Sequence, residues 1–134
     1  MILLDTCALI WAVNQQPLST AARKTIAKAA SEGELFLSPV SAWEIGLLVR
    51  RGRLTLQISA ETYVARAFAR PDVRIAELTP EIAVRASYLP GAFHDDPADR
   101  MLVATAVALG LRLVTRDRRI LDYGAAGFVP VIEC

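Results

Sequence analysis

The sequence predicts an α/β fold, a single three-layer domain in which helices cover both faces of a central and mostly parallel sheet. Short apolar runs alternate along the chain with longer segments of helical periodicity. No repeat, linker or low-complexity tract interrupts this alternation, so residues 1–134 are expected to form one domain. Strands that alternate with helices favour parallel pairing, because a helix returns the chain to the same end of the sheet.

Each expected strand is a short apolar run bounded by polar or turn-forming residues. In chain order the strands are residues 2–6, 34–38, 73–78, 111–115 and 128–133. The first run contains Asp5 at its end and the fourth is followed by Asp117, so two carboxylates stand where strands finish. Ligands of open parallel sheets bind beyond the carboxyl ends of the strands, which makes this edge the expected site.

Each expected helix has apolar residues at helical spacing and a start or stop signal. In chain order the helices are the segment directly after Asp5, residues 18–33, 41–52, 59–70, 79–89 and 97–110, and a short helix after Asp117. Ser19 or Thr20 starts the second of these, and Pro80 takes the first position of the fifth.

Composition narrows the class of protein. With 54% hydrophobic and 22% charged residues, the chain is unlike a disordered protein, and part of its apolar surface is expected to meet a partner. No apolar run approaches the roughly 20 residues of a membrane span, and no basic segment precedes the first apolar run. Cys7 and Cys134 make neither a disulfide framework nor a zinc motif. We therefore expect a soluble, unexported, cytoplasmic protein in which Cys7 is buried and inert.

The acidic residues near the expected site each have a structural explanation. Asp5, Asp96 and Asp117 can each cap the helix that follows, and Glu44 completes the capping-box pattern S-A-W-E. Asp99 lies in a first helical turn, where the helix dipole favours an anion. Taken singly, each residue leaves a cap and a functional role open.

Helical spacing weakens the cap explanation for Glu44 and Asp99. Both have leucine or valine three and four residues later, so both side chains are expected to point towards the core. Arg100 and Arg116 cannot neutralise the acidic residues next to them, because adjacent residues point in different directions. A different positive charge is needed.

Several carboxylates at one sheet edge would repel one another, since two like charges 4 Å apart cost about 4 kcal/mol at an effective dielectric constant near 20. A divalent cation removes this repulsion, and oxygen ligands select Mg²⁺ or Mn²⁺. Two metals about 3.5–4 Å apart can activate water and stabilise the leaving oxygen in phosphodiester hydrolysis. One or two such ions are therefore expected.

Other chemistries lack the residues they need. His94 is the only histidine, which excludes RNA cleavage by a histidine pair. The sequence has no P-loop, dinucleotide-binding or serine-hydrolase motif. A phosphatase of the haloacid dehalogenase type needs an aspartate where Cys7 stands. A phospho-receiver domain needs a lysine at a late strand end, and Lys24 and Lys28 both lie on an early helix.

Four segments carry a more specific signal. They are D-T-C-A-L-I-W (5–11), S-A-W-E-I (41–45), H-D-D-P-A-D-R-M-L-V-A-T-A (94–106) and L-V-T-R-D (113–117). In this order they resemble the signature segments of PIN-domain ribonucleases, above all the VapC-type toxins of bacterial and archaeal toxin–antitoxin pairs. The resemblance spans essentially the whole chain and departs from the pattern at Ala98, where the motif usually carries phenylalanine.

The resemblance implies a PIN-like fold and endonuclease cleavage of RNA that depends on Mg²⁺ or Mn²⁺. It implies that the catalytic, metal-binding carboxylates are Asp5, Glu44, Asp99 and Asp117. Asp5, Asp99 and Asp117 would hold a metal with an activated water, and Glu44 would position a second metal or orient that water. It further implies a homodimer and a VapB-type antitoxin that docks over the active-site groove.

Supporting residues are expected around these carboxylates. The resemblance implies hydroxyl contacts from Thr6 and Thr115 to the metal or its water. Asp96 is expected to be a helix cap first and an outer metal contact second, and His94 a loop or hydrogen-bonding residue rather than a ligand. Asp95 is expected to be solvated.

Arginine supplies thirteen of the fifteen basic residues, and its guanidinium suits phosphate recognition. The candidates for RNA phosphate contacts are Arg50, Arg51, Arg100 and Arg116. Solvated surface arginines are the alternative for each of them.

Three other functions stay open on the sequence. One is a PIN-like domain that no longer cuts and serves as an RNA-binding or scaffolding module. The others are a related metal-dependent DNA nuclease and a general metal-dependent phosphatase. All four carboxylates are present, which favours cleavage, and the chain has no large insertion of the kind that clamps DNA.

Overall fold

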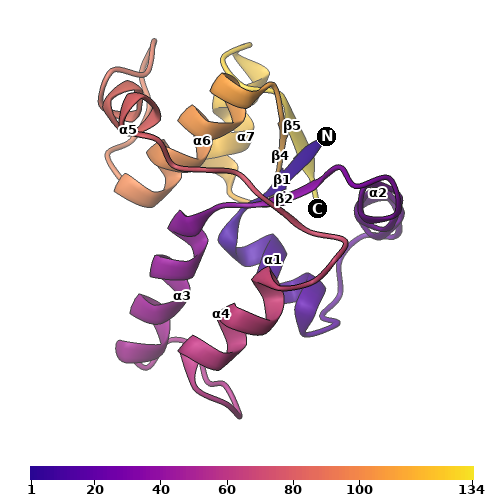
Figure 1. Ribbon diagram of the computed structural model, residues 1–134. Helices are drawn as coiled ribbons and strands as arrows, with labels where there is room; N and C mark the ends of the chain where they lie inside the picture. The colour runs from indigo at the N-terminus through magenta and orange to yellow at the C-terminus, as the bar shows by residue number, and fades with distance from the viewer.

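The computed structural model describes residues 1–134 and has three layers, with one sheet between two groups of helices (Figure 1). The strands are β1 (Ile2–Leu4), β2 (Leu35–Leu37), β3 (Arg74–Ile75), β4 (Arg112–Thr115) and β5 (Val131–Glu133). They form one sheet in the order β3-β2-β1-β4-β5, and every pair of neighbours is parallel. The predicted α/β class is confirmed.

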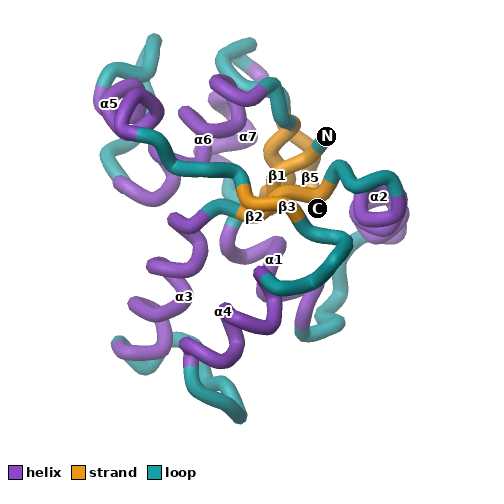
Figure 2. The backbone as a smooth tube through the Cα atoms, viewed as in Figure 1, coloured by secondary structure: helices purple, strands orange, loops and turns teal.

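Seven helices connect or follow the strands (Figure 2). They are α1 (Thr6–Val13), α2 (Thr20–Ser31), α3 (Pro39–Arg50), α4 (Ala60–Phe68), α5 (Pro80–Ser87), α6 (Pro97–Leu109) and α7 (Arg118–Ala125). None of these helices combines the length and apolar character that crossing a membrane requires.

The core lies on both faces of the sheet. Ile2 and Leu4 of β1 pack on one face with residues of α1, α2 and α4, whereas Leu3 packs on the other face with α6 and α7. All three side chains are buried, because helices cover both faces. This is why the strand is a continuous apolar run and not an alternating one.

Side-chain caps start the helices. The N-cap residues are Asp5, Ser19, Ser38, Ser59, Thr79, Asp96 and Asp117. The caps predicted for Asp5, Asp96 and Asp117 are therefore confirmed. A side-chain oxygen at this position accepts one of the backbone N–H groups that a helix leaves unpaired at its start.

The predicted start of α3 is wrong. The helix begins two residues earlier, at Pro39, and Ser38 caps it by accepting the Val40 N–H at 3.1 Å. Proline suits the first helical position because its fixed φ angle matches the helix. Ser41 is therefore buried inside the helix, and Glu44 lies in its second turn with no capping role.

The strand register determines which residues meet at the carboxyl edge of the sheet. Leu4 of β1 is paired with Val114 of β4, so the next residues, Asp5 and Thr115, lie side by side. β2 pairs with the other side of β1, and the chain then enters α3. The starts of α1, α3 and α7 thus gather at one edge.

Candidate active site

A polar hollow of about 390 Å³ opens at this edge, and we call it the acidic hollow. Its lining residues are Asp5, Thr6, Cys7, Trp11, Glu44, Asp96, Asp99, Leu102, Arg116, Asp117 and Arg119. All four carboxylates singled out from the sequence line it, each from a different segment: the β1–α1 junction, α3, α6 and the β4–α7 junction.

Asp5 is the most buried of the four, with 6% of its surface exposed. One oxygen accepts the Ala8 N–H at 2.7 Å, and the other accepts the Thr115 hydroxyl at 2.6 Å. Burial raises the pKa of Asp5 to about 6, although these two hydrogen bonds oppose the rise. The Asp5 carboxylate is therefore fixed in orientation and short of positive charge.

Asp117 lies beside Asp5 but is in a different electrostatic state. Burial acts to raise its pKa, but hydrogen bonds from the N–H groups of Ile120 and Arg119 and from the Arg119 guanidinium lower it below the ordinary value. The guanidinium nitrogen is 3.4 Å from the carboxylate. Arg116, the adjacent residue, points elsewhere as predicted, and Arg119 is the partner that the sequence did not indicate.

Glu44 is held by Thr6. The Thr6 hydroxyl donates to Glu44 Oε1 and also lies 3.1 Å from the hydroxyl oxygen of Ser41. Burial raises the pKa of Glu44, and the Thr6 hydrogen bond opposes the rise. Thr6 and Thr115 are thus both buried residues whose hydroxyl groups orient a carboxylate.

Asp99 occupies the first turn of α6 and has the most perturbed carboxyl group of the site. Burial raises its pKa to about 7, and the charges of Asp96 and Asp117 add to the rise. Its backbone N–H donates to Asp96 Oδ2 at 2.9 Å. Its carboxylate is 3.0 Å from Nε2 of His94.

His94 was expected to be a loop or hydrogen-bonding residue rather than a ligand, and the structure adds that its ring lies beside Asp99, a contact that the sequence did not predict. One potential ligand atom from each of His94, Asp99 and Asp117 lies within 4.8 Å of the other two. Sequence position offered a signal, because His94 is two residues before the cap of α6 and the ring can fold back over the first helical turn.

Arg100 is not placed for the predicted RNA contact. Its Nε donates to Ala86 O at 2.7 Å, and one Nη donates to the carbonyl oxygens of Phe93 and His94 at 3.1 and 3.2 Å. The guanidinium is thus partly buried against backbone carbonyls, where it holds the loop before α6. Arg100 therefore stabilises this loop, and the expected phosphate contact does not agree with its position.

The other predicted arginines differ in position. Arg116 lines the acidic hollow, donates to the carbonyl oxygens of Cys134 and Pro17, and stacks on Trp11 with its Cζ 4.2 Å from the ring centre. Arg50 and Arg51 are exposed at the end of α3 and do not line the hollow. Their contacts with RNA stay predictions.

Cys7 is exposed, so the expectation that it is buried is wrong. It lies in the first turn of α1, on the rim of the acidic hollow. Partial desolvation, followed by the charge of Asp5, raises the pKa of its thiol to about 11. A thiol with a raised pKa is a weaker nucleophile at neutral pH, and the inertness of Cys7 stays a prediction.

The donor set of the acidic hollow fits a hard divalent cation. Its potential ligands are carboxylate oxygens, with one imidazole nitrogen beside them. The raised pKa values of Asp5 and Asp99 mark negative charge that the protein's own groups leave uncompensated. A bound cation would relieve that condition.

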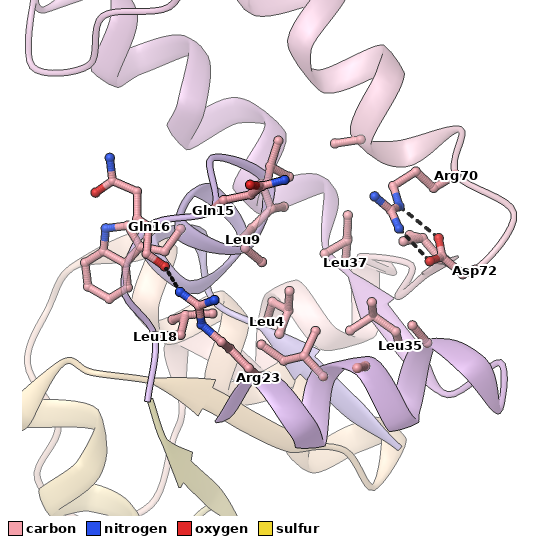
Figure 3. A pocket seen from close by; sticks show the side chains of 18 of the residues that line it. Leu4, Leu9, Gln15, Gln16, Leu18, Arg23, Leu35, Leu37, Arg70 and Asp72 are labelled. Atoms are coloured by element: carbon pink, nitrogen blue, oxygen red, sulfur yellow. Dashed lines mark hydrogen bonds and ion pairs between the residues drawn. The ribbon is translucent and has the colours of Figure 1, made fainter. Parts of the chain in front are cut away.

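A second hollow, of about 560 Å³, lies beside α1, α2 and the end of α4, and we call it the apolar hollow (Figure 3). Thirteen of its nineteen lining residues are hydrophobic, so it suits an apolar occupant. The Arg23 guanidinium donates to Gln16 O at one edge of the hollow, and Arg70 pairs with Asp72 at 2.6 Å at another edge (Figure 3). Trp11 belongs to both hollows.

Comparison with known proteins agrees with these features. The model of the PIN domain family matches residues 2–126. The chain is 38% identical over 123 residues to Ribonuclease VapC22 of Mycobacterium tuberculosis, and the match covers 91% of each chain.

Solved structures show the same fold. VapBC2 from Rickettsia felis, bound to a DNA fragment from its promoter, gives a TM-score of 0.71 at 16% identity and covers 99% of this chain and 98% of that one. DNA-bound VapBC from Salmonella typhimurium gives 0.69 at 17% identity, with 99% and 98% covered. At such identities the likeness concerns the fold.

Proposed function

Because this chain belongs to the PIN-domain family, we propose that it is the toxin of a type II toxin–antitoxin system and cleaves RNA as a metal-dependent endoribonuclease. One observation carries the proposal. Four carboxylates from four separate segments converge in the acidic hollow, and burial raises the pKa of Asp5, Glu44 and Asp99. A fold that keeps mutually repelling carboxylates together needs a cation as their partner. RNA is the substrate that the family and its curated relative support.

Asp5, Asp99 and Asp117 are the proposed metal ligands, and Glu44 is proposed to position a second ion or the attacking water. The proposed cofactor is Mg²⁺ or Mn²⁺, as one or two ions. A bound cation of this kind would lower the pKa of water and stabilise charge on the phosphate.

The chain's own residues orient this chemistry. Thr115 donates a hydrogen bond to one oxygen of Asp5, and Thr6 donates one to Glu44. Each carboxylate is therefore held in a fixed orientation towards the hollow. Arg116 and Arg119 stand on the rim, where a guanidinium can receive the phosphates on either side of the cleaved bond. Arg50 and Arg51, exposed at the end of α3, would contact further phosphates of the RNA strand.

The apolar hollow is proposed to receive an apolar segment of a VapB-type antitoxin. Trp11 connects it to the acidic hollow, so a segment that fills one can continue over the other. Two of the similar solved structures are VapBC complexes, and a third, from Klebsiella pneumoniae, is a toxin–antitoxin complex. An antitoxin bound there would block RNA from the carboxylates.

A homodimer is also proposed. Val84 and Tyr88 of α5 and the adjoining turn are 60% and 81% exposed, although they are large apolar or aromatic residues. They are four residues apart and therefore lie on one side of the element, where a second copy could cover them.

The test is cleavage of total RNA by the purified chain, freed of any partner, in Mn²⁺ or Mg²⁺ and in EDTA. We expect cleavage that requires the metal and is lost in Asp5→Asn, by about 1000-fold in rate for several kcal/mol of lost stabilisation. Asp95→Asn removes an exposed carboxylate from the same surface and serves as the matched control.

Parallel substrates separate the alternatives. Preference for flap DNA or for a small phosphate ester would replace the proposed substrate with DNA or with a phosphatase reaction. Equal cleavage by Asp5→Asn would identify a contaminant. No cleavage in either metal, with the chain folded and free of its partner, would favour the non-cutting RNA-binding or scaffolding module.

A further inference from the structure

His94 belongs to a closed set of contacts around the start of α6. Its Nδ1 accepts the Asp96 backbone N–H at 3.4 Å, and its Nε2 is 3.0 Å from Asp99 Oδ2. The Asp99 N–H in turn donates to Asp96 Oδ2 at 2.9 Å. The imidazole therefore connects the cap of the helix with the carboxylate that the helix presents to the acidic hollow.

The hydrogen-bond pattern indicates which nitrogen carries the proton. Since Nδ1 accepts from Asp96, the neutral ring carries its hydrogen on Nε2, and that nitrogen faces Asp99. Nε2 is buried and makes no hydrogen bond in this structure, although Asp99 Oδ2 lies only 3.0 Å from it, outside hydrogen-bond geometry but within reach of its hydrogen. A buried N–H needs a hydrogen-bond acceptor, and the Asp99 carboxylate is the acceptor that lies beside it.

The same pattern disfavours direct ligation of a metal by His94. To offer a lone pair at Nε2, the neutral ring would have to carry its hydrogen on Nδ1. That hydrogen would then face the Asp96 N–H, so two donors would oppose each other. Hydrogen bonding to the carboxylate requires no such change.

The loop that carries His94 is held from several sides. Arg100 binds the carbonyl oxygens of Phe93 and His94, and Phe93 packs between the rings of His94 and Tyr123 at centroid distances of 4.5 and 4.6 Å. The Tyr123 hydroxyl donates to Pro90 O. The ring is therefore fixed by packing and does not depend on the metal for its position.

We propose that His94 is a positioning residue for Asp99: its Nε2–H holds one carboxylate oxygen so that the carboxylate is presented to the cation in a fixed orientation. The inference rests on the proposed function, because Asp99 must bind the metal. Groups that orient a metal ligand in this way typically contribute 10- to 100-fold to metal affinity or activity, so a loss of about 10-fold is expected without the imidazole.

The test compares His94→Gln, whose amide N–H can replace the Nε2 donor, with His94→Ala, which has none. The readouts are the affinities for Mn²⁺ and Mg²⁺ by calorimetry, the RNA cleavage rate and the melting temperature without metal. Asp95→Asn, in the same loop and exposed, is the control.

We expect His94→Ala to bind both metals about 10-fold more weakly, with the ratio of the two affinities unchanged and Asp95→Asn like the wild type. His94→Gln should recover most of the loss. Equal affinities in His94→Ala and the wild type would overturn the inference. So would a loss in His94→Gln as large as in His94→Ala together with a selective loss of Mn²⁺, which would make the imidazole a ligand.

Failure of the proposed function looks different. In that case the wild type itself binds neither metal, and neither Asp99→Asn nor the His94 variants change the measured metal affinity. A fall in the melting temperature of metal-free His94→Ala, without weaker metal binding in the molecules that stay folded, would assign His94 to the stability of the loop and also overturn the inference.

Discussion

The acidic hollow and the apolar hollow lie next to each other, share Trp11, and are built on opposite principles. In the apolar hollow most lining residues are hydrophobic, and its charged groups are paired or bonded at the edge. In the acidic hollow only Asp117 has a basic side chain that lowers its pKa, and Asp5 and Asp99 are left with raised pKa values. One surface lacks an apolar partner and the other lacks positive charge.

This difference shows what each hollow costs the free protein. Apolar surface that stays exposed adds nothing to the free energy of unfolding. Buried carboxylates that repel one another lower that free energy directly. The acidic hollow should therefore respond to metal and pH, and the apolar hollow to a protein partner. A variant of the apolar hollow that changes metal binding, or a variant of the acidic hollow that changes only partner binding, would contradict this assignment.

The largest expected effect is the loss of metal stabilisation in Asp99→Asn. Mn²⁺ at 100 times its dissociation constant should raise the free energy of unfolding of the wild type by about 2.7 kcal/mol. Asp99→Asn should show little or no rise, and its metal-free stability should equal or exceed that of the wild type, because one repelling charge is gone. Thermal unfolding with and without Mn²⁺ measures both.

Asp99→Ala is the companion variant, since asparagine can still form local hydrogen bonds. If either variant loses about 1 kcal/mol without metal yet keeps the full Mn²⁺ effect, Asp99 acts only at the helix start. Such a result would remove it from the metal site.

The apolar hollow is tested with Ile26→Asp. Ile26 is partly buried in the wall of the hollow, so a charge there should weaken binding of the cognate antitoxin by about 2 kcal/mol or more, the size typical of a central interface residue. Mn²⁺ affinity should not change. Lys24→Asp on the same helix is exposed and outside the hollow, and controls for added charge.

Antitoxin affinity from surface-immobilised binding and Mn²⁺ affinity from calorimetry give the comparison. If Ile26→Asp binds the antitoxin as well as Lys24→Asp does, the apolar hollow is not the docking site. If it loses metal binding as well, the two hollows are coupled through Trp11 and not independent.

The pH dependence of stability sharpens the comparison further. Asp5 and Asp99 have pKa values raised from 3.8 to about 6 and about 7, so between these limits the folded state holds more protons than the unfolded state. Stability of the metal-free protein should therefore fall as the pH rises from about 4 to about 7. The lowered pKa of Asp117 acts below 3.8, outside this range.

Urea unfolding at pH 5 and pH 8, in EDTA and in Mn²⁺, measures this effect. The metal should reduce or reverse the fall, because it binds the ionised carboxylates. A metal-free protein that is more stable at pH 8 than at pH 5 would show that the acidic hollow is not strained by its charge.

The smallest effect is expected at the surface arginines. If Arg51 contacts RNA, Arg51→Glu should weaken RNA binding a few-fold and reduce the slope of log affinity against log salt by about 0.7, because one phosphate is no longer neutralised. Arg85→Glu, exposed on α5, controls for total charge. An unchanged slope in Arg51→Glu would exclude Arg51 from the RNA-binding surface.

Structural features that depend on residues close in sequence could be predicted. The alternation of apolar runs and helical segments determined the layers, and Asp5, Asp96 and Asp117 cap helices as predicted, because a cap needs only the N–H groups two or three residues on. The motifs also indicated which carboxylates converge. Their meeting in the acidic hollow follows from strand order, which the alternation of strands and helices constrains.

Contacts between residues that are distant in sequence were determined only by the tertiary structure. Asp5 and Thr115 are 110 residues apart, yet their hydrogen bond orients the carboxylate. Arg100 turned out to hold a loop, and Cys7 to be exposed, because side-chain packing and not motif position determines what a guanidinium or a thiol meets.

The same division separates the identity of the carboxylates from their charge state. The sequence by itself determined the layered fold, the caps at Asp5, Asp96 and Asp117, and the motif positions of the four acidic residues, since periodicity, capping and motif order depend on residues that are close in sequence. Only the tertiary structure decided that Asp99 faces His94, that Arg119 lowers the pKa of Asp117, and that Asp5 has no such partner. Desolvation and Coulomb energies depend on distances through space, and those distances exist only once the chain has packed.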